Sequence, residues 1–245
     1  MQEKCREFTF ILYMSNPADL KKVFVVVPAF NEGGVIREVV TGLINQNYTV
    51  VLVDDGSDIP VISLLTGLSI HYLRHPVNLG QGAALQTGIE YALSKNAGFI
   101  VSFDADGQHQ IADIPRLLDP LVNNEADIAL GSRFITGGKH NMPVGRKILL
   151  QVGRWLNYLL TGLLLTDAHN GLRTMNRKAA SMVQITENRM AHATELLTQI
   201  KKHKLRYKEI PVTIVYTEYS KKKGQTVWSS FRIFFDLLLN KIFWL

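Results

Sequence analysis

The stretch GFIVSFDADGQH (residues 98–109) sets the fold class of this chain. Its first half is an apolar run with the length of a buried strand, and its second half carries Asp104, Asp106, Gln108 and His109. Charged groups at the end of a buried strand are costly unless they have partners. We therefore expect a strand that delivers a polar site at its carboxyl end.

The same alternation runs along the chain from Lys22 onward. Apolar runs of strand length alternate with helical patterns, which is typical of βαβ units and predicts a mainly parallel sheet flanked by helices. The predicted strands are 23–27, 49–53, 70–74, 98–103, 127–131, 172–176 and 205–216, and the predicted helices are 33–46, 59–66, 81–95, 113–122, 147–165, 193–203 and 227–245.

Four predicted strands are followed by polar motifs: PAFNE, DDGSD, HPVNLGQG and DADGQH. In parallel α/β sheets, ligands bind beyond the carboxyl ends of the strands. We therefore expect the four motifs to line one crevice.

Changes in composition and in apolar periodicity along the sequence predict three parts. Residues 1–21 form a loosely ordered leader, residues 22–217 an α/β domain, and residues 218–245 a basic loop with an amphipathic C-terminal helix. For residues 227–245, a docked core helix and a helix lying on lipid both stay open.

The helix predicted at 147–165 is amphipathic as well. A polar stripe along it predicts a water-facing edge, and therefore a helix that lies at an interface and does not span a bilayer. The stripe consists of Gln151, Arg154, Asn157 and Thr161.

A formal net charge of +6 favours an anionic partner, which could be nucleic acid, a phosphorylated substrate or an acidic lipid surface. The acids at the strand ends argue against nucleic acid, because they would repel phosphate. Cys5 is the single cysteine, which excludes an internal disulfide and fits a cytoplasmic setting.

The turn at 104–108 suits a hard cation. Asp104, Asp106 and the Gln108 amide supply alternating oxygen ligands, which favours Mg²⁺ or Mn²⁺. The alternative is a simple turn or a helix cap, for which Asp113 is the better residue. The glycines of NLGQG do not complete a dinucleotide fingerprint, so they serve close approach of the backbone to a nucleotide or close helix packing.

The ordered set VVVPAFNE, VLVDDGSD, NLGQGAALQTGIEYA, FDADGQH, GSRF and DAHNGLR resembles the inverting family 2 glycosyltransferases of GT-A (Rossmann-like) fold. Within that family the chain is similar to polyprenyl-phosphate sugar synthases of the dolichol-phosphate mannose synthase type, over residues 22–217. The resemblance implies metal-dependent transfer of a sugar from a GDP- or UDP-linked donor to a polyprenyl phosphate of undecaprenyl type. It places the enzyme on the cytoplasmic face of a membrane, in cell-envelope polysaccharide synthesis.

The resemblance also implies roles for single residues. Asp104, Asp106 and Arg133 would be catalytic, and Asp104, Asp106 and Gln108 would bind the metal. Donor nucleotide contacts would come from Pro28, Ala29, Phe30, Glu32, Asp54, Asp55, Asn78, Gly80 and Asp104. Acceptor phosphate contacts would come from Arg133, Arg146, Arg173 and Lys222. Gln81 replaces a lysine common in relatives, which removes one phosphate contact.

Two other functions stay open. The same fold could transfer sugar to a saccharide hydroxyl in surface polysaccharide or O-antigen assembly, which would need a general base. A non-catalytic nucleotide-binding module is the alternative outside enzymes. Whether a membrane-protein partner supplies an anchor is also left open.

Overall fold

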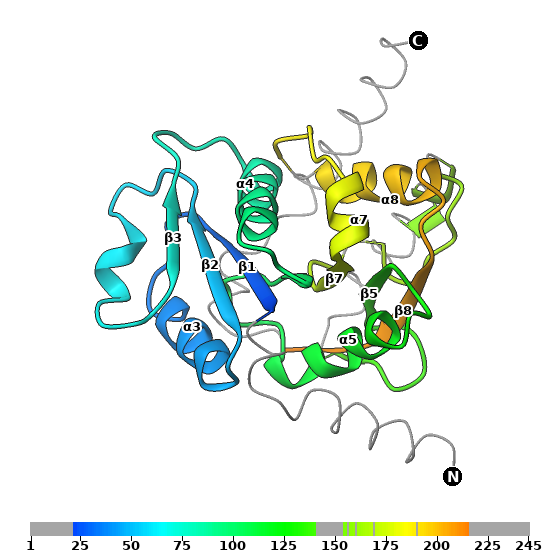
Figure 1. Ribbon diagram of the computed structural model, residues 1–245, viewed down its shortest axis with the longest axis horizontal. Helices are drawn as coiled ribbons and strands as arrows, with labels where there is room; N and C mark the ends of the chain where they lie inside the picture. The colour runs from blue at the N-terminus through cyan, green and yellow to red at the C-terminus, as the bar shows by residue number, and fades with distance from the viewer. Residues whose placement is uncertain are drawn as a thin grey trace.

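The computed structural model describes residues 22–140, 154–155, 157–159, 161–168, 170–189 and 191–215. It is a seven-stranded sheet with helices on both faces (Figure 1) and a separate pair of short strands. The strands are β1 (Val23–Ala29), β2 (Thr49–Asp54), β3 (His71–Arg74), β4 (Phe99–Ser102), β5 (Ile128–Ser132), β6 (Lys139–His140), β7 (Arg173–Asn176), β8 (Tyr207–Pro211) and β9 (Thr213–Ile214). The helices are α3 (Ile36–Asn45), η1 (Val61–Leu64), α4 (Gln81–Ser94), η2 (Ile111–Asp113), α5 (Ile114–Val122), α7 (Arg177–Met182) and α8 (His192–Lys202).

The large sheet has the strand order β3-β2-β1-β4-β7-β5-β8. All its pairings are parallel except those of β7, which runs antiparallel to both β4 and β5. Strand β8 lies at the edge and ends at Pro211, as the sequence predicts for a proline that cannot donate to a further strand. Strands β6 and β9 pair in parallel as the second sheet.

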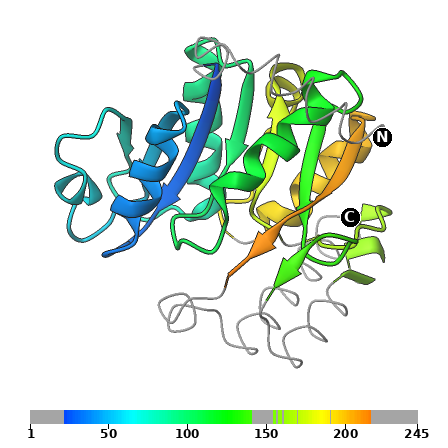
Figure 2. The same ribbon diagram turned by 90° about the horizontal axis from the view of Figure 1, so that it is seen from below.

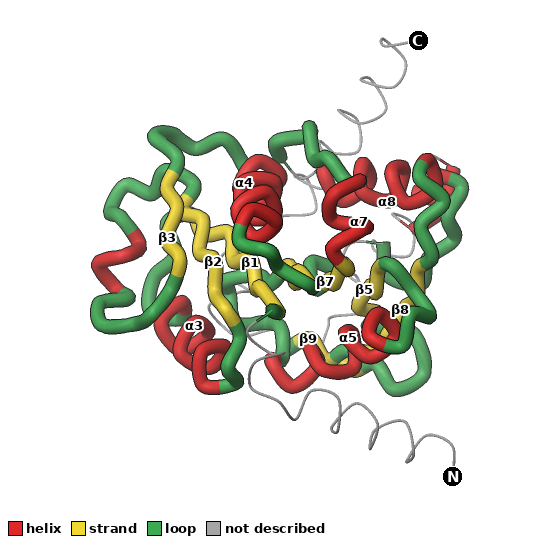
Figure 3. The backbone as a smooth tube through the Cα atoms, viewed as in Figure 1, coloured by secondary structure: helices red, strands yellow, loops and turns green. Residues whose placement is uncertain are grey.

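Two hydrophobic cores lie on the two faces of the sheet, because successive strand residues point to opposite sides. Along β1, Val23, Val25 and Val27 belong to the core under α3 and α5, whereas Phe24 and Val26 belong to the core under α4, α7 and α8. Figures 2 and 3 show these two helical layers, with α3 and α5 together on one face. The predicted α/β class with a mainly parallel sheet flanked by helices is confirmed.

Differences from the predicted elements are local. The predicted strand 205–216 is divided into β8 and β9, which belong to different sheets. The segment at 59–66 contains only the 3₁₀ turn η1, and β6 and α7 were not predicted. Asp113 stands at the N-cap of α5 without capping it, because its side chain accepts hydrogen bonds from Thr213 N and from Arg116.

The predicted water-facing stripe of residues 147–165 is wrong where it can be judged. Residues 154, 155, 157–159 and 161 are helical, and the side chains of Asn157 and Thr161 are buried. Thr194 Oγ1 of α8 donates to Asn157 Oδ1 at 2.9 Å, so the polar edge is satisfied by the protein and not by water.

Several predictions fall outside the described residues: the leader 1–21, the basic loop and helix at 218–245, Arg146 and Lys222. Within the part of the chain that is described, none of the helices has the length and apolar character needed to cross a bilayer.

Candidate active site

The four polar motifs meet at one edge of the large sheet because β1 to β4 run parallel. Ala29 of β1 pairs with Asp54 of β2, and Asp54 pairs with Arg74 of β3, so the strand ends are level. Asn31 links the first two motifs, since its backbone N donates to Ser57 Oγ at 2.9 Å and its amide donates to Asp58 at 3.0 Å. The predicted crevice edge is therefore assembled from residues far apart in the sequence.

Asp104 is held from two sides at this edge. Gln81 Nε2, from the first residue of α4, donates to Asp104 Oδ1 at 2.9 Å, and His109 Nε2 lies 2.9 Å from Asp104 Oδ2. The Asp104 side chain keeps 30% of its surface exposed. Burial raises the pKa of Asp104, but the hydrogen bond and charge of His109, with the charges of His192 and Arg173, outweigh it and lower that pKa. Asp104 therefore presents a fixed carboxylate anion.

His109 is held firmly in this arrangement. Its ring is almost fully buried, packs edge-on against Phe103 with a centroid distance of 5.4 Å, and its backbone forms an isolated bridge with Ile214. With Nε2 donating to Asp104, Nδ1 is buried without a hydrogen-bond partner within the described residues. The sequence left the role of His109 open, and the structure places it as a support for Asp104.

Asp106 lies in the turn opened by Gly107, whose φ of +73° suits glycine. Burial raises the pKa of Asp106, and the charge of Asp104 raises it further. Gln108 supports this carboxylate, since its backbone N donates to Asp106 Oδ1 at 3.0 Å and its side-chain amide also donates to Asp106. Two carboxylates that repel each other would be stabilised by a cation between them.

Gly171 leaves space for the Asp104 carboxylate. A Cβ atom on Gly171 would lie 2.2 Å from Asp104 Oδ2, and Ser102 Oγ fixes the glycine by donating to its carbonyl at 2.7 Å. The carboxylates of Asp104 and Asp106 fit Mg²⁺ or Mn²⁺, which take oxygen ligands and retain positions for water and substrate phosphates. Within the described residues, no three His, Cys, Asp or Glu side chains form a group that could hold a metal ion.

Asp54 and Asp55 are buried and fully engaged within the protein. Asp54 accepts from Ser57 N and Val61 N, each at 2.9 Å, and from the Tyr72 hydroxyl at 2.7 Å. Burial raises the pKa of Asp54, but these hydrogen bonds outweigh it and lower that pKa.

Asp55 organises the loop that follows β3. It accepts from Leu79 N at 3.0 Å and Gly80 N at 2.7 Å, and its Oδ1 lies 2.7 Å from His75 Nδ1. Tyr72 and His75 are thus supporting residues that the sequence did not single out. Contact of Asp54 and Asp55 with a nucleoside stays a prediction.

The glycines of NLGQG serve close packing. A Cβ on Gly80 would lie 2.3 Å from Asn188 O, and one on Gly82 would lie 2.0 Å from Glu187 O. Gly82 N also donates to Asn188 O at 2.8 Å. The segment around residues 187–188 therefore lies directly against the start of α4.

The other predicted nucleoside contacts lie on the same edge. Pro28 and Ala29 are buried at the end of β1, Glu32 is partly buried, and Asn78 is exposed. Phe30 is an aromatic ring with 41% of its surface exposed. Their contacts with a donor stay predictions.

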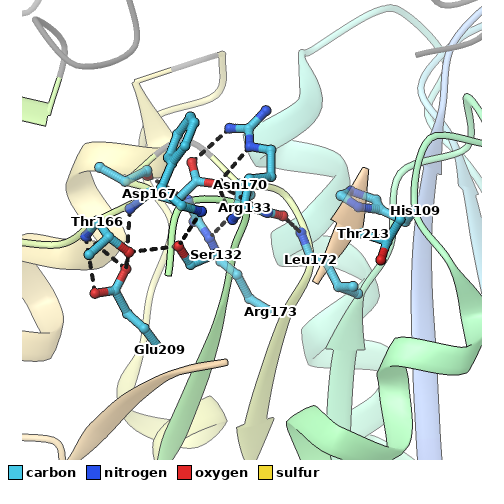
Figure 4. A network of polar contacts seen from close by, with 12 residues as sticks. His109, Ser132, Arg133, Thr166, Asp167, Asn170, Leu172, Arg173, Glu209 and Thr213 are labelled. Atoms are coloured by element: carbon cyan, nitrogen blue, oxygen red, sulfur yellow. Dashed lines mark hydrogen bonds and ion pairs between the residues drawn. The ribbon is translucent and has the colours of Figure 1, made fainter. Parts of the chain in front are cut away.

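Arg133 follows β5 and is buried in an ion pair with Asp167 (Figure 4). Its Nε donates to Asp167 Oδ2 at 2.6 Å and its Nη2 to Asp167 Oδ1 at 2.7 Å, while the Arg133 backbone N donates to Oδ2 at 3.0 Å. Such a two-pronged pair is strong and directional. Asp167 was not singled out in the sequence, although it begins DAHNGLR.

Glu209 of β8 fixes the residues before Asp167. Thr166 N and Oγ1 donate to Glu209 Oε1 at 2.8 and 2.6 Å, and the Thr166 and Ser132 hydroxyls lie 2.6 Å apart (Figure 4). The segment leading to Gly171 is thus tied to both β5 and β8.

Arg173, at the start of β7, is buried beside these acids. Its Nε donates to Asn170 O at 2.9 Å and its Nη2 to Ala168 O at 3.3 Å. Burial lowers the pKa of Arg173 to about 10, although the charges of Asp104 and Asp167 raise it, so the side chain is a cation at neutral pH. Arg133 pairs with Asp167, and Arg173 lies within the electrostatic reach of Asp104 and Asp167. The contact of either arginine with an acceptor phosphate stays a prediction.

Comparisons with known proteins find a family model and relatives that match most of this chain. The family model described as Glycosyl transferase family 2 matches residues 24–182. An uncharacterised protein of Methanocaldococcus jannaschii is 36% identical over 93% of this chain and 96% of its own length. A Methanococcus voltae protein named UDP-N-acetylglucosamine–dolichyl-phosphate N-acetylglucosaminyltransferase is 32% identical over 91% of this chain and 97% of its own length. The undecaprenyl-phosphate mannosyltransferase of Micrococcus luteus is 28% identical over 82% of this chain and 87% of its own.

Solved structures share the fold, which confirms the predicted GT-A-like class. Glucosyl-3-phosphoglycerate synthase from Mycobacterium tuberculosis, in complex with Mn²⁺, UDP and phosphoglyceric acid, superposes with a TM-score of 0.63 at 16% identity. The match covers 81% of this chain and 73% of that chain. At this identity the likeness concerns the fold alone.

Proposed function

Because this chain belongs to glycosyl transferase family 2 and is a hexosyltransferase, we propose that it moves a sugar from a nucleotide diphosphate sugar to a polyprenyl phosphate at a membrane surface. The proposed reaction requires a divalent cation, Mg²⁺ or Mn²⁺, and inverts the anomeric centre. The proposed location is the cytoplasmic face of the membrane, with the protein bound peripherally.

The observation that carries the cation requirement is the environment of Asp104. Its carboxylate is oriented by Gln81 and His109, is partly exposed, and occupies space that Gly171 leaves open. In this proposal Asp104 and Asp106 hold the cation and Gln108 either joins them or steadies Asp106. A cation bound there would act as a Lewis acid that neutralises the charge on the departing diphosphate.

Relatives support a lipid phosphate as acceptor. The names of the Methanococcus and Micrococcus proteins specify dolichyl and undecaprenyl phosphate, and each of these relatives aligns over most of its own length. Crystals of structural neighbours hold Mn²⁺ and UDP, which supports a nucleotide donor with a divalent cation. The donor base, GDP or UDP, is left to experiment.

The chain's own residues then have separate tasks. Arg173, a buried cation near Asp104, attracts the acceptor phosphate together with Arg146 and Lys222. Arg133 is predicted to contact the same phosphate, although Asp167 already neutralises much of its charge. An ionised phosphate oxygen is itself a nucleophile, so attack on the anomeric carbon needs no strong general base, and attack opposite the diphosphate inverts that carbon.

Glu195, in the first turn of α8, has a structural role in this scheme. Its carboxylate accepts hydrogen bonds from Thr186 N at 3.0 Å and Glu187 N at 2.9 Å, which holds the segment that packs on α4. If the acceptor were a saccharide hydroxyl and not a phosphate, the reaction would require a general base.

The test is transfer with a panel of radiolabelled nucleotide sugars and undecaprenyl phosphate, with Mn²⁺ or with EDTA. We expect one donor to yield a lipid-linked sugar only when the cation is present. Transfer to a saccharide with no lipid product from any donor would overturn the proposed acceptor. Undiminished turnover in EDTA would overturn the cation requirement.

A further inference from the structure

The described helical residues 154–155, 157–159 and 161 are inverted in polarity. Asn157 and Thr161 point into the protein, where Asn157 Oδ1 accepts from Thr194 Oγ1 at 2.9 Å and Thr161 Oγ1 donates to Asn157 O at 2.7 Å. A helix on the surface of a water-soluble domain normally buries its apolar side and exposes its polar side. Here the polar positions are the buried ones.

The outward side is correspondingly apolar. Trp155, Tyr158 and Leu159 stand at helical spacings of three and four, with 56%, 38% and 76% of their surfaces exposed, and Leu164 follows with 45%. The rings of Trp155 and Tyr158 meet edge-on with centroids 6.2 Å apart. We call Trp155, Tyr158 and Leu159 the apolar face. Exposing such side chains to water is unfavourable unless something apolar covers them.

Cations border the apolar face. Gly162 lies directly against the Lys201 side chain, since a Cβ on this glycine would clash with Lys201 Nζ. Lys201 and Lys202 end α8 and are exposed. Tryptophan and tyrosine beside lysines suit the boundary between lipid tails and headgroups, where the rings enter the apolar layer and the ammonium groups meet anionic headgroups.

We propose that the apolar face and Lys201 form the surface by which this protein docks on an anionic lipid bilayer. The inference rests on the proposed function for its biological sense, since the acceptor is a lipid. The apolar face also continues along the chain into the segment containing Asp167 and Gly171, which contact Arg133 and Asp104. Docking by this face would hold the site at the surface that carries a lipid phosphate.

The test is co-sedimentation of the full chain with vesicles of phosphatidylcholine containing about one third phosphatidylglycerol. Leu159→Asp and Trp155→Ser should each lower the vesicle partition coefficient about tenfold, because each removes an apolar side chain from the lipid. Lys201→Glu should weaken binding to these vesicles and leave binding to pure phosphatidylcholine unchanged.

The matched control is Ile59→Asp. Ile59 is 75% exposed, like Leu159, but lies on the loop after β2, far along the chain from the apolar face. This variant should bind vesicles like the unmodified protein. All variants should keep the circular dichroism spectrum and Tm of the unmodified protein, because the changed side chains are exposed. If Leu159→Asp does not fold, Trp155→Ser tests the same face.

The proposal is overturned if the unmodified protein does not bind vesicles, or if Leu159→Asp and Ile59→Asp behave alike. It is also overturned if Leu159→Asp leaves vesicle binding intact but converts a dimer to a monomer in sedimentation velocity, which would make the face an interface between copies. Transfer to a short, water-soluble polyprenyl phosphate separates the two proposals. Leu159→Asp should retain transfer to this soluble acceptor. If the unmodified protein lacks that transfer activity, the proposed function is contradicted and the docking proposal is not.

Discussion

At the scale of single residues, Gly171 is important because it has no Cβ atom beside the Asp104 carboxylate. Gly171→Ala would place a methyl group 2.2 Å from Asp104 Oδ2. Because the carboxylate would have to move, and overpacking costs about 1–3 kcal/mol, we expect the Kd for Mn²⁺ to rise about tenfold. Titration followed by electron paramagnetic resonance measures it. Gly98→Ala is the control, since its Cβ would meet Lys22 Cβ at an ordinary 3.5 Å; equal affinities in both variants would contradict the role of Gly171.

Gln81 offers a second test of the Asp104 environment. As a neutral donor to Asp104 Oδ1 it orients the carboxylate without neutralising it. Gln81→Lys would put an ammonium beside Asp104 and compete with a divalent cation, so the Kd for Mn²⁺ should rise at least as much as in Gln81→Ala. Isothermal titration with MnCl₂ measures the Kd of both variants. Tighter Mn²⁺ binding by Gln81→Lys than by Gln81→Ala would refute the competition between the ammonium and the cation.

The carboxylates themselves give the most direct test of the reaction. Asp104→Asn and Asp106→Asn should each reduce kcat by about 10³-fold, because the charge that holds the cation is lost while size is kept. The Tm of each variant, measured by calorimetry, should stay close to that of the unmodified protein. Wild-type turnover in either variant would remove that residue from the mechanism.

At the scale of elements, the Arg133–Asp167 pair joins the end of β5 to the segment before β7. Asp167→Asn would leave a buried guanidinium without its counter-charge, so we expect a loss of about 3–5 kcal/mol in the free energy of unfolding. Urea denaturation measures this loss. Removing both groups in Arg133→Met with Asp167→Leu should restore part of the stability, and a double variant less stable than Asp167→Asn would contradict the explanation.

The elements that carry regular patterns were predictable from the sequence. β1 and β2 are continuous apolar runs because both faces are covered, and α4 follows a helical pattern over its length. The direction of β7 was not predictable, because strand polarity depends on neighbours and not on residue pattern. The split between β8 and β9 depends in the same way on pairing with different sheets.

For the candidate site, the sequence indicated the acidic residues but not the residues around them. Motif order indicated Asp104 and Asp106, but the sequence could not reveal that Gln81, His109 and Gly171 surround Asp104, since they come from separate elements. Nor could it show that Asp54 and Asp55 accept hydrogen bonds from the backbone of neighbouring loops and contact Tyr72 and His75. The polar stripe at Asn157 and Thr161 had the right period but faced the opposite way, because periodicity does not say which side is inside.

At the scale of the whole molecule, Asp127 ties the start of β5 to the start of β8 and the end of β7. It accepts from Arg206 N at 3.0 Å and Asn176 Nδ2 at 3.2 Å, and pairs with the Arg206 guanidinium at 3.0 Å. The hydrogen bonds from Arg206 outweigh burial and hold the pKa of Asp127 far below its ordinary value.

This low pKa gives the fold a defined acid sensitivity. The unfolded chain binds a proton at Asp127 more readily than the folded one, so the stabilisation is complete above about pH 5 and is lost as the pH falls below about 4. Asp127→Asn should therefore lower the Tm at pH 7 by roughly 2–4 °C. Calorimetry should find that the gap to the unmodified protein narrows toward pH 3, and a gap that widens there would contradict this sign.

The antiparallel placement of β7 against β5 has a further consequence for how such enzymes diversify. Antiparallel neighbours can be joined by a turn of two residues, yet here residues 133–172 make the connection. The pairing of β5 with β7 does not require that excursion, which also carries β6 and the Arg133–Asp167 pair. Under the proposed function, insertions in this segment would alter acceptor binding while β1 to β4 keep their mutual pairing.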